Sequence, residues 1–102
     1  MYIHMKDDKF LKCIVDANRR KILKFLGRGE RCVNDIANHL GIEQSLTSHH
    51  LKVLRDCGLV KTRHDGKRIM YSLSNPEIDS VLGMIEKVAN KIKEVRPNKE
   101  CE

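Results

Sequence analysis

One segment near the middle of the chain most constrains its fold. Residues 43–57 have the apolar spacing of a helix that buries one side, and Gly58 directly after them predicts where that helix ends. Two short strand-like runs follow, residues 59–64 and 68–73, and the Asp65-Gly66 pair between them is typical of a hairpin turn. The segment therefore predicts a helix that runs directly into a β-hairpin.

Three further helices are predicted ahead of this segment. Residues 7–16 carry one apolar stripe at helical spacing. Asn18 can cap a second helix that ends at Gly27. A third helix over residues 33–40 has apolar residues at positions i, i+3, i+4 and i+7, and Gly41 closes it.

Only residues 41–42 separate the third and fourth helices, so residues 33–57 predict a helix-turn-helix. The hairpin over residues 59–73 is then its wing. We predict a winged helix-turn-helix that is mainly α with a small β-hairpin, in the order four helices, two strands and a terminal helix. At 102 residues, the chain has the size of one domain, residues 1–102.

The terminal helix is predicted over residues 75–95, because Asn75-Pro76-Glu77 is a strong helix start. Its apolar residues form a seam at near-heptad spacing: Ile78, Val81, Leu82, Ile85, Val88 and Ile92. Such a seam exceeds the needs of one small core, so we expect a homodimer through this helix and the helix at residues 7–16. The alternative is a helix that only covers the chain's own core. Residues 96–102 predict a flexible polar tail.

The charge distribution favours nucleic acid as the partner. The formal net charge is +6 and the pI is near 9.3, as expected of a nucleic-acid binder. Residues 44–73 hold six Lys or Arg against two Asp, whereas the terminal helix has no basic excess. A helix that begins with hydroxyl, amide and imidazole groups beside a basic hairpin has the form of a duplex-DNA reader. A second basic cluster at residues 19–31 either adds phosphate contacts or only solvates a helix.

Other classes of protein fit less well. No run of 18 apolar residues exists and the first residues lack an export signal, so we expect a cytoplasmic protein without membrane contact. No nucleophile–base set, phosphate loop or carboxylate pair is present, which argues against an enzyme. The four cysteines, Cys13, Cys32, Cys57 and Cys101, contain no C-x₂-C pair. They are either small core residues or a ligand set that forms only in the folded chain.

The chain resembles the ArsR/SmtB family of metal- and thiol-responsive repressors over about residues 17–95. The residues that carry the resemblance are Asn18-Arg19-Arg20 with Ile22-Leu23, residues 30–37 (ERCVNDIA), Gln44-Ser45 with Ser48-His49-His50-Leu51, Cys57-Gly58-Leu59-Val60, and Asp65-Gly66-Lys67 with Tyr71-Ser72-Leu73. The resemblance implies a homodimer that binds double-stranded operator DNA and releases it when an inducer binds.

On that basis the candidate DNA-binding residues lie on the fourth helix and the wing. They are Gln44, Ser45, Ser48, His49, Lys52, Arg63, Lys67 and Arg68. Gln can bond an adenine edge through two hydrogen bonds, and Ser reaches base edges or phosphate. The neighbouring Thr47 and His50 are expected to have structural roles instead.

The resemblance also places the candidate metal or redox residues at Cys32, Cys57, Cys13 and Cys101. The family's best-known thiol site is a Cys-Val-Cys, and here Cys32-Val33 is followed by Asn34, so one ligand is missing. A second family site uses His and Asp on the terminal helix, which in this chain has no His. We expect a soft ion as inducer, with As(III), Cd(II) or Zn(II) as candidates, and no fixed cofactor.

Three alternatives stay open at this point. The cysteines can sense oxidants rather than ions. The winged helix can bind DNA constitutively, without a small inducer. It can also be a protein-interaction module that never touches DNA, although such modules usually lack a basic wing and a polar helix start.

Overall fold

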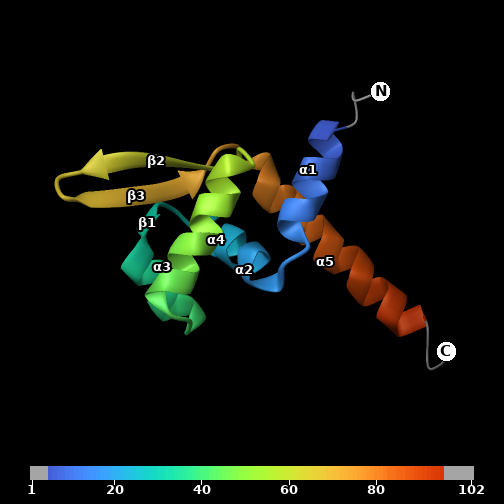
Figure 1. Cartoon of the computed structure of the whole chain (residues 1–102). Coiled ribbons are helices and arrows are strands. Elements are labelled where there is room, and N and C mark those ends of the chain that lie inside the picture. The colour runs from blue at the N-terminus through green and yellow to red at the C-terminus, as the bar shows by residue number, and fades with distance from the viewer. Residues whose placement is uncertain (1–4, 96–102) are drawn as a thin grey trace.

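The structure is a computed structural model that describes the backbone of residues 5–95 and the side chains of residues 6–92. Its elements in chain order are α1 (Met5–Ile14), α2 (Ala17–Leu26), β1 (Arg31–Cys32), α3 (Val33–Leu40), α4 (Gln44–Asp56), β2 (Val60–Asp65), β3 (Arg68–Leu73) and α5 (Glu77–Val95). The β2–β3 hairpin extends from one side of the helical body and α5 from the other (Figure 1). This confirms the predicted helical fold with a hairpin wing. The predicted tail lies outside the described residues.

The start of α2 differs from the prediction. Asp16, not Asn18, caps this helix: its backbone is extended and its carboxylate accepts a hydrogen bond from the Arg19 backbone N–H at 3.1 Å. Asn18 therefore lies inside the first turn. The prediction was wrong because Asp and Asn are equally good caps. Which of them caps the helix depends on which residue has an extended backbone in the turn between α1 and α2.

The turn between α3 and α4 follows the prediction. Gly41 ends α3 in the left-handed conformation, with φ 72° and ψ 32°, and its N–H donates to the Ala37 carbonyl at 2.8 Å. A residue with a Cβ is strained in this conformation, which explains the glycine. The chain reverses here and α4 packs against α3, so the two helices form the predicted helix-turn-helix.

The sheet contains one strand that was not predicted. β1 pairs antiparallel with β3, with Cys32 opposite Met70, and the strand order is β1-β3-β2. β2 and β3 form the wing, and Gly66 at the hairpin turn has φ 64°. The positive φ at the first central residue is what a two-residue hairpin loop requires. β1 therefore joins the base of the wing to the start of α3.

The core is aliphatic and lies where the five helices and the base of the wing meet. Its buried members are Cys13, Ile14, Ile22, Leu23, Leu26, Ile36, Leu51, Leu54, Leu59, Val60, Ile78 and Leu82. α4 contributes the fully buried Leu51 and Leu54. Because these residues follow the helical period, burying them turns the opposite, polar side of α4 to solvent.

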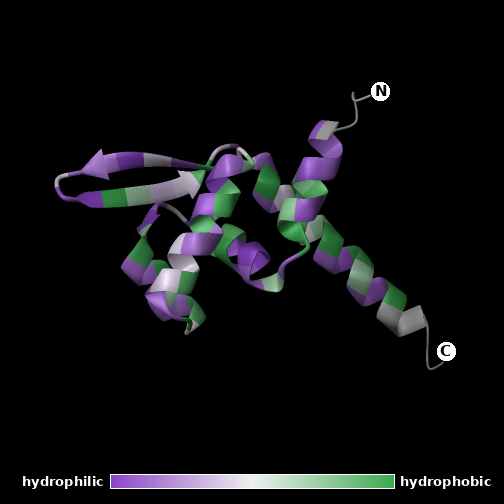
Figure 2. Cartoon of the chain, viewed as in Figure 1, coloured by the Kyte–Doolittle hydropathy of each residue, from purple (hydrophilic) through white to green (hydrophobic). Residues whose placement is uncertain are grey.

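The apolar seam predicted on α5 is buried in the chain's own core at its start and exposed along the rest of the helix. Ile78 and Leu82 are only 7% and 2% exposed because the first turns of α5 pack on the chain's own core. Their prediction as dimerisation residues is therefore corrected. The apolar residues that stay exposed are Val81, Met84, Ile85, Val88 and Ile92; Figure 2 shows hydrophobic segments recurring along this helix. Among the described residues, no helix is both long and apolar enough to cross a membrane.

Candidate nucleic-acid interface

The first turns of α4 expose the polar side chains that were predicted to enter a groove. Gln44, Ser45, Ser48 and His49 are all exposed, whereas Thr47 is fully buried. The Thr47 hydroxyl donates a hydrogen bond to the Glu43 carbonyl at 2.9 Å, which fixes the orientation of this turn. The four exposed residues therefore lie on the solvent side of α4.

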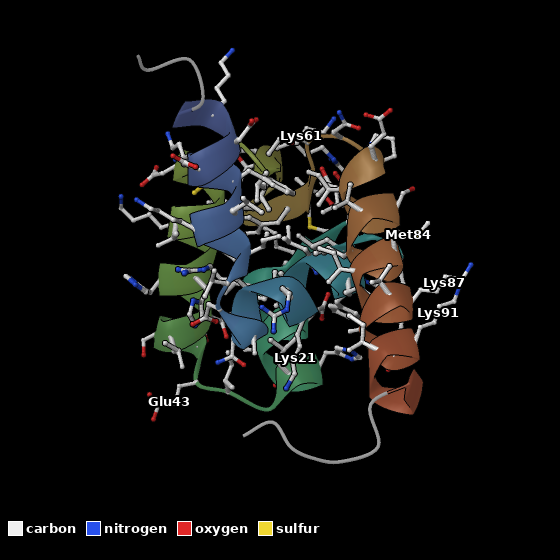
Figure 3. The ribbon with its side chains drawn as sticks, turned by 90° about the vertical axis from the view of Figure 1, so that its right-hand side faces the viewer. Lys21, Glu43, Lys61, Met84, Lys87 and Lys91 are labelled. Atoms are coloured by element: carbon white, nitrogen blue, oxygen red, sulfur yellow. The ribbon has the colours of Figure 1, made fainter. Side chains whose placement is uncertain are left out.

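The N-terminus of α4 is open to solvent. Glu43, the residue before the helix, makes no side-chain hydrogen bond to the first turn, and it lies at the end of α4, pointing away from the chain (Figure 3). The first backbone N–H groups of a helix lack partners within the helix and carry partial positive charge. This end of α4 can thus accept an anionic oxygen such as a phosphate.

His50 has the opposite environment. It is 6% exposed, and its Nε2 lies 4.0 Å from the Asp16 carboxylate, while its buried Nδ1 has no hydrogen-bond partner among the described residues. Burial lowers the pKa of His50, although Asp16 acts to raise it. His50 therefore joins α4 to the start of α2, as the sequence suggested, and faces away from solvent.

Both wing arginines contact the segment that leads into α3. The Arg63 guanidinium donates two hydrogen bonds to the Glu30 carboxylate, at 2.7 and 2.8 Å. Arg68 donates to Cys32 Sγ at 3.2 Å and lies 3.9 Å from the Asp35 carboxylate. The hydrogen bonds from Arg63 lower the pKa of the Glu30 carboxyl group. These contacts hold the wing against the helix-turn-helix.

The two candidate lysines have different surroundings. Lys52 pairs with Asp56 at 3.2 Å across one turn of α4, and both side chains are largely exposed. Lys67 is exposed at the hairpin turn beside Gly66. A solvated ion pair of the Lys52 type is weak, so both ammonium groups can reach a phosphate.

The second basic cluster has a role that the sequence did not reveal. Arg19 donates to the Cys13 carbonyl at 2.8 Å, and Arg20 donates to the carbonyls of Ile14 and Val15, each at 2.7 Å. The last carbonyls of a helix lack partners within it. Arg19 and Arg20 therefore cap the C-terminus of α1. This role is neither the phosphate contact nor the helix solvation that the sequence suggested for the cluster.

Cys13 and Cys57 lie together although they are far apart in sequence. Cys13 is 2% exposed in α1, and Cys57 is half-buried at the C-terminal end of α4. The Val53 carbonyl accepts the Cys57 backbone N–H at 2.9 Å and lies 3.9 Å from Cys13 Sγ. Burial, and to a lesser extent the neighbouring Cys57 thiol, raises the pKa of the Cys13 thiol to about 12.

The other two candidate cysteines do not join this pair. Cys32 is buried at the start of α3 beside Arg68, and Cys101 lies outside the described residues. Within the described part of the chain, no three His, Cys, Asp or Glu side chains come close enough to hold a metal ion together. Of the candidate cysteines that the structure describes, Cys13 belongs to the core cluster and Cys57 packs against it.

Glu30 and Asp35 are contacts that sequence reasoning missed. The only signal available was charge complementarity between acids near the start of α3 and arginines of the wing. The sequence separation between these acids and the wing arginines follows no fixed pattern, because the contacts depend on the β1–β3 pairing that brings the two segments together.

Residues 16–62 match the family model described as "Bacterial regulatory protein, arsR family". The chain is 41% identical over 70 residues to the probable mercury resistance operon repressor of Streptomyces lividans, which covers 69% of this chain and 56% of that protein. It is 39% identical over 72 residues to the arsenical resistance operon repressor of Staphylococcus aureus, which covers 71% of this chain and 69% of that protein. The chain thus spans little more than half the length of the mercury repressor.

The fold is also similar to a solved structure, the homodimeric winged helix-turn-helix DNA-binding domain of a possible ArsR-family transcriptional regulator from Mycobacterium bovis. The TM-score is 0.80 at 26% identity, and the match covers 93% of this chain and 88% of that one. The described elements therefore have the arrangement of a winged helix-turn-helix.

Proposed function

The chain belongs to the ArsR family of bacterial regulatory proteins, and from that premise we propose that it is a repressor that binds operator DNA as a homodimer and leaves it when a soft metal or metalloid ion binds its cysteines. Membership of a family of regulators also means that it is not an enzyme. The observation that carries the proposal is the exposed, polar and uncapped start of α4 beside a basic wing. A protein that acts on operator DNA belongs in the cytoplasm.

In the proposed complex, α4 enters the major groove. Gln44 and Ser48 contact base edges, and Ser45 and His49 contact base edges or the backbone, together with the free N–H groups of the first turn. Lys52 and Lys67 contact phosphates. Arg63 and Arg68 are part of the wing, contact Glu30 and Cys32, and add positive charge to the hairpin.

The proposed dimer uses α5 and α1. The exposed apolar stripe of α5 runs from Val81 to Ile92, and Leu11 and Val15 are large apolar residues exposed on α1 and on the turn after it. Soluble monomers seldom leave a row of large apolar side chains exposed along one helix. Two copies of α4 about 34 Å apart would then fit successive turns of the major groove.

Two observations favour a soft ion as inducer. The two relatives described above are named for mercury and arsenical resistance. The chain has four cysteines, and thiolates select soft ions. Cysteine thiols can also be oxidised reversibly, so oxidation is the second candidate for the signal.

The test is DNA binding by the reduced chain, measured by fluorescence anisotropy on duplexes selected from a random pool. We expect a preferred sequence, and an affinity that falls about a thousandfold or more between 50 and 200 mM salt if the dimer neutralises about six to ten phosphates. A chain that binds no duplex at low salt contradicts the DNA-binding half of the proposal.

Two substitutions distinguish recognition of bases from binding to the phosphate backbone. Gln44→Ala should reduce discrimination between the preferred sequence and single-base variants by about 1–3 kcal/mol at one position. Lys67→Ala should weaken binding to all sequences and lower the salt slope by about one. If both variants weaken all sequences equally, α4 does not read bases through Gln44.

A further inference from the structure

One large apolar side chain lies exposed near the start of α4. Leu46 is 40% exposed, and it follows the polar Gln44 and Ser45 in the first turn of the helix. Among the described residues, the other exposed large apolar side chains lie on α1, on the turn after it and on α5, apart from Ile69 in the wing. The proposed dimer surface therefore does not account for Leu46.

Packing within the chain does not account for Leu46 either. The described residues that pack against the buried core include Val53, which lies seven residues further along α4 and on the same side, but they do not include Leu46. A single exposed leucine on an ordinary surface needs no explanation. This leucine, however, is on the helix that we propose to enter the major groove. An apolar side chain there either meets an apolar group or leaves polar base edges without partners.

The position of Leu46 on α4 gives it access to the bases in the proposed complex. Leu46 lies three residues before the exposed His49 and four before the buried His50, so it is located where the solvent side of the helix meets the buried side. It also belongs to the first turn, which the hydrogen bond from Thr47 to the Glu43 carbonyl orients. A recognition helix contacts base edges mainly through its N-terminal residues. Leu46 can therefore reach a base edge beside the helix axis.

We propose that Leu46 is a specificity-determining residue that packs against the C5 methyl group of one thymine in each half-site of the operator. This inference rests on the proposed function and deepens it. Of the four standard bases, thymine is the one that presents a methyl group in the major groove. The polar residues assigned to base reading, Gln44 and Ser48, recognise hydrogen-bond donors and acceptors rather than this methyl group.

Attraction and exclusion both favour thymine at this position. Burying one methyl group against the leucine should raise affinity about threefold to fivefold. Cytosine has only a hydrogen at C5, and an amino group lies beside it. An apolar side chain that excludes water from that amino group leaves a donor without a partner. Leu46 thus distinguishes thymine from cytosine without making a hydrogen bond.

Gln44 and Leu46 should read different base pairs. They are two residues apart, which corresponds to a rotation of about 200° around the helix. They therefore face opposite sides of the α4 axis in the groove. Substituting one of them should leave the base preference due to the other unchanged.

The experiment removes one methyl group at a time from the DNA. Each thymine of the preferred duplex is replaced singly by deoxyuridine, which lacks the C5 methyl group and keeps the hydrogen-bonding groups of thymine. We expect one position in each half-site at which this change weakens wild-type binding about threefold to fivefold, measured by competition in fluorescence anisotropy. Leu46→Ala should bind the thymine and deoxyuridine duplexes equally well at that position. Cytosine there should bind the wild type more weakly than thymine, and 5-methylcytosine should recover about threefold with the wild type only.

Ile69→Ala is the matched control. Ile69 has the same exposed fraction as Leu46, 40%, but lies on β3 of the wing. This variant should keep the wild-type preference for thymine over deoxyuridine at the position that Leu46 reads. Because Leu46 is exposed and alanine favours a helix, Leu46→Ala should fold, which circular dichroism checks. Leu46→Met retains an apolar side chain and should keep part of the preference.

The outcomes separate this inference from the proposed function. If Leu46→Ala and the wild type respond equally to deoxyuridine at every position, the inference fails, while sequence-specific binding by the wild type leaves the proposed function standing. Equal weakening of the thymine and deoxyuridine duplexes by Leu46→Ala shows that Leu46 only supports the helix, which overturns the inference in the same way. If the wild type binds no duplex at low salt, the proposed function fails and this inference fails with it.

Discussion

At the scale of single residues, His50 shows how a polar group in the α4 helix can be structural. Its neighbours His49 and Ser48 are exposed, whereas His50 is buried against α2 and lies 4.0 Å from Asp16, which also caps that helix. The contact fixes the rotation of α4 relative to α2. The rotation of α4 determines which of its side chains face solvent, so we expect His50 to position the proposed base-reading residues from the buried side of the helix.

The pKa of His50 gives a prediction about stability. Burial lowers this pKa below its ordinary value of 6.5, so the unfolded chain binds a proton at a pH where the folded chain does not. Stability should therefore fall as the pH drops below about 6.5, and His50→Gln should reduce this loss. Urea unfolding between pH 7.5 and 5.0 measures the effect.

The matched control is His49→Gln. His49 is exposed, so its replacement should leave the loss of stability on acidification close to that of the wild type. The Asp16 carboxyl titrates in a lower range, since its pKa is held below its ordinary value of 3.8. An acid-induced loss that is the same in wild type and His50→Gln above pH 5 would contradict the assignment.

At the scale of elements, the wing is tied to the helix-turn-helix at two levels. The β1–β3 pairing joins their backbones, and the Arg63–Glu30 and Arg68–Cys32 contacts join their side chains. Glu30 neutralises an arginine on the proposed DNA-binding side. Glu30→Gln should therefore raise affinity for all duplexes and increase the salt slope by up to about one, because one more cation faces phosphate.

Anisotropy at several salt concentrations measures this change. Thermal stability should hardly differ from the wild type, because ion pairs at this degree of exposure contribute little. Glu86→Gln is the control, since Glu86 pairs with Lys24 at the distant α2–α5 contact. Weaker DNA binding by Glu30→Gln would show instead that the ion pair is needed to position the wing.

Elements with a strong local pattern could be predicted from sequence, and those that depend on distant pairing could not. The α3–α4 turn follows from helical periodicity and Gly41, and the hairpin from Asp65-Gly66. β1 has only two residues and exists because β3 lies beside it. For the same reason, the exposed residues of α4 could be read from the helical period, whereas the packing of Cys57 against the cluster that contains Cys13 could not.

At the scale of the whole molecule, the exposed stripe of α5 is the surface through which we propose that two copies of the chain associate. Val81, Met84, Ile85, Val88 and Ile92 are each 40–57% exposed, and Met84 points away from the rest of the chain beside Lys87 and Lys91 (Figure 3). Val88→Glu places a charge in the proposed interface. We expect this variant to sediment as a monomer at micromolar concentration and to bind operator about a hundredfold more weakly, because the second half-site is no longer at high effective concentration.

Asn90→Glu adds the same charge to an exposed position on the opposite side of α5. It should remain dimeric and keep the operator affinity of the wild type. Val88 is exposed in the single chain, so both variants should fold. A Val88→Glu protein that stays dimeric would place the interface on another surface.

The short strand β1 has one more consequence. Because β1 pairs with the hairpin at the start of α3, the position of the hairpin relative to α4 is already fixed in the free protein. Little ordering entropy is then lost on docking, and we expect any adjustment of shape to come from the nucleic acid. Base steps that bend easily should therefore be favoured at positions that no side chain touches.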